Sequence, residues 1–295
     1  MFTVLQWALL GSLFVPALTA LGLVSMLRWV RLRKRERSPV SDKLLRSPGE
    51  SLRKEIEKMD EHINDILIWT FFGPAFFAAV LMLFNGGLKP ADSSVIVAII
   101  VPAAVAVFGL LIWRLIYLLN RRRDFRLGFA GERAVAEELN QLMLDGCRVF
   151  HDVPMEAYGN IDHVVVAPTG VYAVETKARR KTKAPDGKWN YEIVFDGKTL
   201  HLPGGIDARS LEQAKQQADR LRAALSKAVG EPVKVGAILT FPGWWVTRQG
   251  KSETMVLNPK EIRAAVTNGS SPRLSKQLIE RVVYQLDRKC RDVEF

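Results

Sequence analysis

The sequence predicts a mixed α/β domain, with a central sheet flanked by helices, that follows three membrane-spanning helices. Three observations lead to this fold class. Two β-branched, apolar runs within residues 161–177 flank a tight turn, as in a buried hairpin. Amphipathic helical patterns cover residues 131–145 and 210–229. Three long uncharged runs come first in the chain, each about long enough to cross a bilayer.

Length and composition divide the chain into an apolar first part and a polar second part. The 295 residues suffice for one or two domains with a sizeable core. We expect a membrane region over residues 1–124, a globular domain over 125–245 and a C-terminal extension with a terminal helix over 246–295.

The net charge indicates which kinds of partner the protein binds, and the cysteines indicate the redox compartment of its globular domain. A net charge of +11 favours polyanionic partners, either nucleic acid or anionic lipid headgroups. The two cysteines, Cys147 and Cys290, show no CxxC or His-Cys spacing. A disulfide framework and a zinc site are therefore not expected, and reduced thiols fit a cytosolic domain.

The three uncharged runs predict transmembrane helices at about residues 4–27, 66–84 and 95–119. The first run has 24 residues without a charge, and the second has 19. A third run of 19 uncharged residues begins at Val95, and Arg114 can snorkel towards the headgroups while the helix continues. Buried core helices of a soluble protein are the alternative.

The basic residues predict the orientation of these helices. Arginines and lysines cluster directly after residue 27 and again over 121–126, whereas the loop at 85–94 is nearly uncharged. The positive-inside rule then gives a multi-pass protein of the inner (plasma) membrane, with the N-terminus outside, a cytosolic loop over 28–65 and a cytosolic C-terminal domain. Membrane lipid is accordingly an expected partner. Cleavage near Ala20 is the alternative for the first run, although the apolar residues continue past it.

Three charged residues interrupt the hairpin at 161–177. Asp162 lies near the start of the first strand, and Glu175 and Lys177 lie late in the second. Side chains alternate across a strand, so Glu175 and Lys177 share a face with Thr176 opposite. The hairpin brings Asp162 to the same end as Glu175 and predicts a pair of carboxylates beside an ammonium. Charges at the ends of an edge strand are the alternative interpretation.

The remaining patterns complete the expected domain. In the helix at 131–145, Glu132 projects from the apolar face; a favourable position near the positive end of the helix dipole is its alternative role. We further expect a strand at 148–153, a hairpin at 189–202 with a type I′ turn at Asp196-Gly197 that extends the edge of the sheet, a helix at 210–229, a strand at 233–241 and a helix at 271–289.

Several other side chains are candidates for binding. Arg179, Arg180, Lys181 and Lys183 follow the second strand and can track a nucleic-acid backbone; a solvated basic loop is the alternative. Trp244 and Trp245 can stack on bases, although packing is favoured at a strand end. His163 points away from the face of Asp162 and reads as a packed histidine. Ser210 and Gln213 have the spacing of a capping box.

The order of these motifs resembles the nuclease-related domain (NERD) family of the PD-(D/E)xK nuclease superfamily over residues 125–240. Four blocks carry the resemblance: Gly128-Phe-Ala-Gly-Glu132, then Gly159-Asn-Ile-Asp162 with the strand that follows, then Gly170 to Glu175-Thr-Lys177, then Gln213. Where the family usually has an Asn-Pro pair before that glutamine, this chain has Arg209 and Ser210.

The resemblance implies a restriction-endonuclease-like fold and a metal-dependent phosphodiesterase. Asp162 and Glu175 would bind Mg²⁺ or Mn²⁺, with the carbonyl of Thr176 as a further ligand. Lys177 would act on the attacking water or the phosphate, Glu132 would support the metal, and Gln213 would contact water or substrate. The implied function is cleavage of nucleic acid, DNA before RNA, at the cytosolic face of the membrane. A catalytically silent domain that binds nucleic acid or a protein partner is the alternative, and the oligomeric state stays open.

Overall fold

The computed structural model describes residues 23, 25, 26, 29, 42–85, 90–155, 159–268 and 273–293. The chain divides into two compact units. One includes residues 57–122, and the other joins residues 42–56 to the chain from 123 onward. The nuclease-like residues all lie in the second unit.

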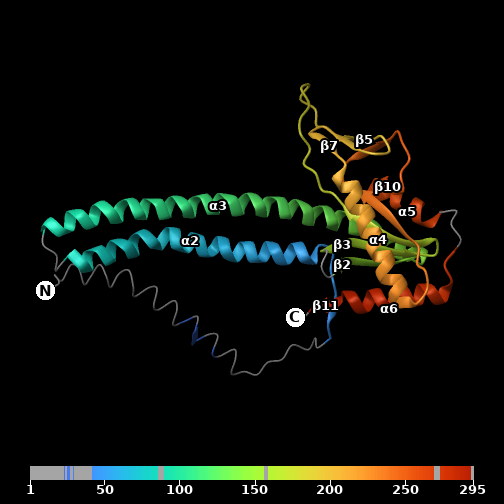
Figure 1. Cartoon of the computed structure of the whole chain (residues 1–295), viewed down its shortest axis with the longest axis horizontal. Coiled ribbons are helices and arrows are strands. Elements are labelled where there is room, and N and C mark those ends of the chain that lie inside the picture. Colours follow the sequence, from blue (N-terminus) through green and yellow to red (C-terminus); the bar gives the residue numbers. More distant parts are fainter. Residues whose placement is uncertain are drawn as a thin grey trace. The chain divides into compact units, whose positions relative to one another are not determined.

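The first unit is built from most of two long helices, α2 (Glu50–Asn85) and α3 (Pro90–Asn140), which lie side by side (Figure 1). Among the described residues, one helical segment is long and apolar enough to cross a membrane, Val101–Asp145. Its large apolar side chains are exposed, for example Val105 at 67% and Trp113 at 65%. Length and composition therefore make this segment a candidate membrane helix.

Of the three predicted membrane helices, one is supported over the described residues, and it overlaps the predicted span at 95–119. The predicted span at 66–84 lies within α2, which does not pass the same test over its described residues. The predicted span at 4–27 lies almost wholly outside the described residues. The helix expected at 131–145 is also not separate, because α3 continues without a break through the arginine-rich stretch at 121–126. Arginine is a good helix former, so charge alone does not end the helix.

The second unit is organised around a five-stranded sheet in the order β10-β8-β4-β3-β2. Strands β2 (Arg148–Pro154), β3 (Asn160–Ala167) and β4 (Gly170–Thr176) are antiparallel neighbours. Strands β8 (Val235–Thr240) and β10 (Thr254–Leu257) add to it in parallel. The mixed sheet and its central hairpin are thus confirmed.

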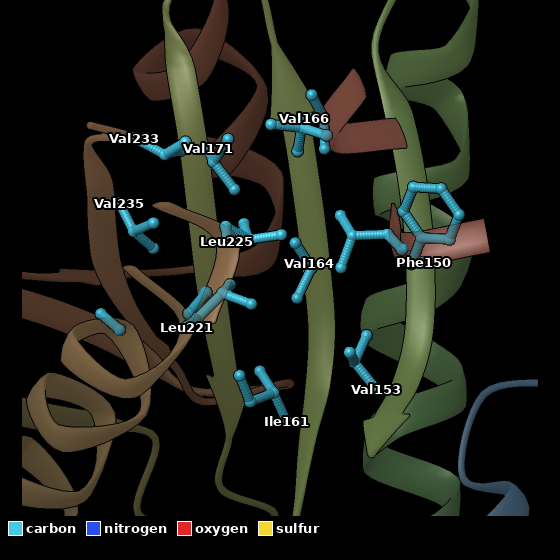
Figure 2. Packing of buried hydrophobic residues seen from close by; sticks show 14 of the residues in the cluster. Phe150, Val153, Ile161, Val164, Val166, Val171, Leu221, Leu225, Val233 and Val235 are labelled. Atoms are coloured by element: carbon cyan, nitrogen blue, oxygen red, sulfur yellow. The ribbon is translucent and has the colours of Figure 1, made fainter. Parts of the chain in front are cut away.

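Helices cover both faces of this sheet. On one face, α4 (Arg209–Val229) and α6 (Lys276–Cys290) bury valines of β3 and β4, and Figure 2 shows Leu221 and Leu225 against Val164 and Val171. On the other face, the end of α3 and α5 (Pro259–Thr267) pack on the alternate residues of the same strands. Because both faces are covered, the central strands are apolar on both sides, as in their sequence.

A second sheet stands beside the first, in the order β7-β6-β5-β9. Its strands are β5 (Glu192–Phe195), β6 (Leu200–Leu202), β7 (Gly205–Asp207) and β9 (Trp245–Arg248). The expected hairpin is therefore present, but it does not extend the edge of the central sheet. Its loop is also not a type I′ turn, which needs positive φ at both central residues, because only Gly197 has one. Asp196 instead accepts the backbone N–H groups of Lys198 and Thr199.

The two ends of the second unit meet in a short two-stranded sheet. Strand β1 (Leu44–Leu45) pairs antiparallel with β11 (Arg291–Val293). Arg46 donates to both carboxylate oxygens of Asp292, at 2.8 and 2.6 Å. The segment that precedes α2 is thereby part of the nuclease-like fold.

Candidate functional site

The central hairpin brings Asp162 and Glu175 to one end of the sheet. The two strands are antiparallel, and their register pairs His163 with Val174. Asp162, which precedes His163, and Glu175, which follows Val174, therefore lie at the same end of the hairpin. The carboxylate of Asp162 accepts the backbone N–H of Thr176 at 2.7 Å, which fixes it beside the end of β4. The sequence prediction of a carboxylate pair at this corner is thus matched by the geometry.

Lys177 and Gln213 enclose one oxygen of Glu175. The Lys177 Nζ lies 2.6 Å from Glu175 Oε1. Gln213 Nε2 donates to the same oxygen at 2.7 Å, and Lys177 Nζ donates to Gln213 Oε1 at 2.9 Å. The three side chains form a closed triangle that fixes the ammonium and the amide relative to the carboxylate.

Helix α4 supplies Gln213 because its apolar face is anchored on both sides of that residue. Leu211 and Ala214 are buried in a cluster with Phe241 and strands of the second sheet. The expected capping box is absent, because Ser210 lies inside the helix and donates its hydroxyl to Asp207 at 2.7 Å. Gln213 is then free to point at Glu175 instead of at the helix end.

Glu132 reaches the site from α3. The helix packs closely against the chain just after β4, and this is possible because residue 131 is a glycine. A Cβ on Gly131 would lie 2.6 Å from the Cβ of Ala178, the residue after Lys177. Glu132 is 8% exposed and accepts a hydrogen bond from the backbone of Gly49. Gly49 has φ +69° and leaves no room for a side chain beside Phe129. Both glycines are therefore needed to enclose the Glu132 carboxyl.

The carboxyl groups raise one another's pKa. Burial first, and then the charges of Asp152 and Glu175, raise the pKa of Glu132 to about 8. Burial first, and then the charges of Glu175 and Glu132, raise the pKa of Asp162 well above its usual range. Glu175 is 3% exposed, and its Oε2 is buried without a hydrogen-bond partner. The corner therefore gathers carboxyl groups that hold their protons more strongly than usual, and a bound cation would favour their charged forms.

These donors fit a hard divalent cation in chemistry. Mg²⁺ prefers oxygen ligands and is usually held by one or two carboxylates, with water or phosphate completing the shell. Asp162 and the unpartnered Oε2 of Glu175 supply two such oxygens, and Thr176, whose carbonyl is the third expected ligand, follows Glu175 directly in sequence. Over the ranges that the structure describes, no group of three or more His, Cys, Asp or Glu side chains is arranged to hold a metal. The fit thus rests on two carboxylates, without Glu132 as a third ligand.

One acidic residue near the site, Asp152, was not predicted from the sequence. Asp152 in β2 is 4% exposed and has φ +49°, which is unusual for a residue other than glycine. Its carboxylate accepts from Arg46 at 3.0 Å, from the hydroxyl of Ser51 at 2.7 Å and from Asn160 at 3.0 Å. The only signal in the sequence is a charged residue within an otherwise buried strand.

Each of the four basic residues predicted to contact nucleic acid has a partner within the protein. Arg179 pairs with Asp207 at 2.8 Å, and Arg180 pairs with Asp124 at 2.6 Å. Lys181 lies over the ring of Trp244, and Lys183 lies over that of Trp189. The geometry makes the run more ordered than a freely solvated loop.

Of the remaining candidates, His163 and Trp244 are packed in the interior, whereas Trp245 is exposed. His163 is fully buried, and its Nδ1 lies 2.9 Å from Nδ1 of His151. Trp244 is 3% exposed and packs in the core of the second sheet, whereas Trp245 is 65% exposed.

Comparison with known proteins agrees with this geometry. Neither the curated proteins nor the solved structures contain a match to the chain. A family model does match part of it, and the matched part begins in α3 before Glu132 and ends just after β8. It contains all of the residues that meet at the carboxylate corner. Residues 127–242 match the NERD family model and form a nuclease-related domain.

Proposed function

We propose that this protein is a membrane-anchored, metal-dependent nuclease that hydrolyses phosphodiester bonds of DNA on the cytosolic side of the inner (plasma) membrane. The observation that carries the proposal is the corner itself. Asp162, Glu175 and Lys177 lie at one end of the hairpin with Gln213 bonded to two of them, inside the matched nuclease-related region.

In this proposal Asp162 and Glu175 would hold Mg²⁺ or Mn²⁺, together with the carbonyl of Thr176. The ion, when bound, supplies a Lewis acid for the phosphoryl oxygens and acidifies a bound water. Gln213 holds Glu175 Oε1, so Oε2 is directed away from the triangle. Lys177 keeps an ammonium beside the phosphate position, where it can orient the attacking water or offset charge on the phosphorane.

Membrane attachment is supported by the exposed apolar surface of α3. Exposed side chains such as Val105, Leu110 and Ile116 would contact water unless lipid covers them. The arginines at 121–126 follow this surface directly, and the positive-inside rule places such a cluster in the cytosol. DNA is the favoured substrate because a domain on the cytosolic side of the inner (plasma) membrane has access to DNA. The basic residues from Arg179 to Lys183, which follow Lys177, can also contact its phosphates.

The test uses the full chain purified in a mild detergent, incubated with plasmid and linear DNA in Mg²⁺, Mn²⁺ or EDTA. We expect cleavage only with a divalent ion, and loss of cleavage in Glu175→Gln and Asp162→Asn. Glu137→Gln is the matched control, because Glu137 is an exposed carboxylate on α3. Cleavage by Asp162→Asn at the wild-type rate would place the reaction elsewhere.

A silent binding domain is the second candidate, and one observation favours it. Glu175 Oε1 is already bonded by Lys177 and Gln213, and the described residues hold no cluster of three metal-binding side chains. If folded wild-type protein cleaves no DNA and binds no Mn²⁺ in titration calorimetry, but still retains DNA in a gel-shift assay, this second function replaces the first.

A further inference from the structure

A cavity of about 460 Å³ opens beside the carboxylate corner. This volume lies within the ~300–1,000 Å³ range of small-ligand pockets. Its walls include Arg179, Arg180, Leu202, Ile206, Arg209 and Trp244. None of these residues is part of the triangle around Glu175, so the cavity is a separate feature.

Chain geometry places this cavity next to the reacting groups. Arg179 follows Lys177 by two residues, which is at most about 7 Å of extended chain. Arg209 precedes Gln213 by four residues on α4, which is about one helical turn or 6 Å. Trp244 Nε1 donates to the carbonyl of Arg179 at 3.2 Å and fixes that wall. A strand whose phosphate sits at the corner would therefore place a neighbouring nucleotide at the cavity.

One side of the cavity is cationic. Three guanidinium groups line it, against the single carboxylate of Asp207. Arg179 is paired with that carboxylate, whereas Arg209 is exposed and makes no ion pair with any residue that the structure describes. A phosphate is the natural partner for an unpaired guanidinium.

The other side is apolar and open. Ile206 is 70% exposed and lines the cavity together with Leu202 and Trp244, so this side offers apolar surface to a ligand. It stands on β7, where it pairs with His201 across a hairpin that turns at Pro203 and Gly204. Apolar side chains of this kind pack against the flat face of a nucleobase.

We infer that the cavity binds an unpaired nucleotide next to the scissile phosphate, so that the substrate of the proposed nuclease is single-stranded or frayed DNA. In a duplex the faces of the bases are stacked on one another and cannot pack on Ile206, so a duplex would use the phosphate contact with Arg209 alone. A single strand offers both a phosphate and a free base face. The inference rests on the proposed function for the placement of the scissile phosphate.

The test compares the binding of one fluorescent oligonucleotide, as a single strand and as a blunt duplex, to the full chain in detergent with EDTA. We expect the single strand to bind about tenfold more tightly or better. Arg209→Ala should weaken single-strand binding about five- to tenfold and lower the log-log salt slope by about one. Ile206→Ser should weaken single-strand binding and leave duplex binding unchanged.

Lys227→Ala is the matched control, since Lys227 is an exposed cation in the last turn of the same helix. It should change affinity less than twofold, and circular dichroism should show every variant folded. Equal binding of both DNA forms, or an Arg209→Ala effect no larger than that of Lys227→Ala, overturns the inference. Metal-dependent plasmid cleavage, measured separately, decides the proposed function. Cleavage without a single-strand preference therefore rejects only the cavity, and the preference without cleavage rejects only the nuclease.

Discussion

At the scale of single residues, Lys177 and Gln213 differ from Asp162 and Glu175 in what they contribute. The two carboxylates supply the negative oxygens of the corner, and burial makes their charge costly. Lys177 and Gln213 stabilise the charge of Glu175 through two contacts with its Oε1, and a third contact joins Lys177 to Gln213. Removing a carboxylate and removing the ammonium should therefore have different consequences.

Lys177→Met should spare metal binding and lower turnover roughly 100-fold or more, the range of a lost catalytic proton-transfer group. Glu175→Gln should lower both, because it removes a charged ligand. Mn²⁺ titration beside plasmid cleavage measures the two effects, and Lys215→Met controls for the loss of an exposed, ion-paired lysine. Equal loss of metal affinity in Lys177→Met and Glu175→Gln would contradict this division of roles.

Arg46 illustrates a second residue-scale effect, the support of a buried carboxylate. Arg46→Met should destabilise the domain by about 3 kcal/mol, because Asp152 then remains buried with one donor fewer. Arg263→Met removes a comparable ion pair, in which the side chains of Arg263 and Asp145 are 56% and 25% exposed. Its loss should lower the free energy of unfolding by no more than about 1 kcal/mol. Denaturant unfolding of both variants measures the difference, and equal costs would count against the role of Asp152 as a buried anion.

At the scale of elements, strands β2 and β3 are joined by a histidine pair. His151 Nδ1 contacts His163 Nδ1, and His151 Nε2 contacts Asn140 Oδ1 at 3.0 Å. One Nδ1 must donate and the other accept, so at least one ring has to be neutral. Burial lowers the pKa of His151 to about 4.

This pair predicts weaker stability in mild acid. The folded pKa of His151 lies below its ordinary value of 6.5, so the unfolded chain takes up the proton first as the pH falls. The stability that His151 contributes is present above pH 6.5 and is lost as the pH falls towards 4. The free energy of unfolding should therefore decrease by on the order of 2 kcal/mol between pH 7 and pH 5. Comparing the unfolding midpoints of wild type and His151→Gln at both pH values isolates the effect from Glu132, whose raised pKa acts in the opposite direction. A parallel loss in both proteins would rule out His151 as its source.

Periodicity explains which elements the sequence could predict. The hairpin around Pro168 and Thr169 follows from local residues, and so do the shared face of Glu175 and Lys177 and the apolar stripe of α4. The second sheet could not be foreseen, because its pairing of β5 with β9 joins distant segments. Asp152 was missed for the same reason, since its donors Arg46 and Ser51 lie about a hundred residues away. Long-range partners leave no periodic trace.

At the scale of the whole molecule, the protein combines a nuclease-related domain with a candidate membrane helix. We predict that full-length protein stays in the membrane fraction after alkaline carbonate washing, because the exposed apolar side chains of α3 need lipid. A C-terminal fusion to alkaline phosphatase should be inactive, and a fusion to a fluorescent protein should fluoresce, if the proposed orientation holds, because the positive-inside rule predicts a cytosolic position for the arginines at 121–126. An active phosphatase fusion would reverse the proposed orientation.

The pairing of β1 with β11 also has a consequence for how the protein is made. Arg46 and its partner Asp292 are separated by 246 positions in the chain, and α6, which completes one core cluster, comes directly before β11. At ~5–20 residues per second, a ribosome needs roughly 10 to 50 s to add the residues between them. During that time the first strand has left the ribosome without its partner, and the sheet lacks one covering helix. The domain can therefore close only after Asp292 has been synthesised, by which time the helix at 101–145 is already available for insertion.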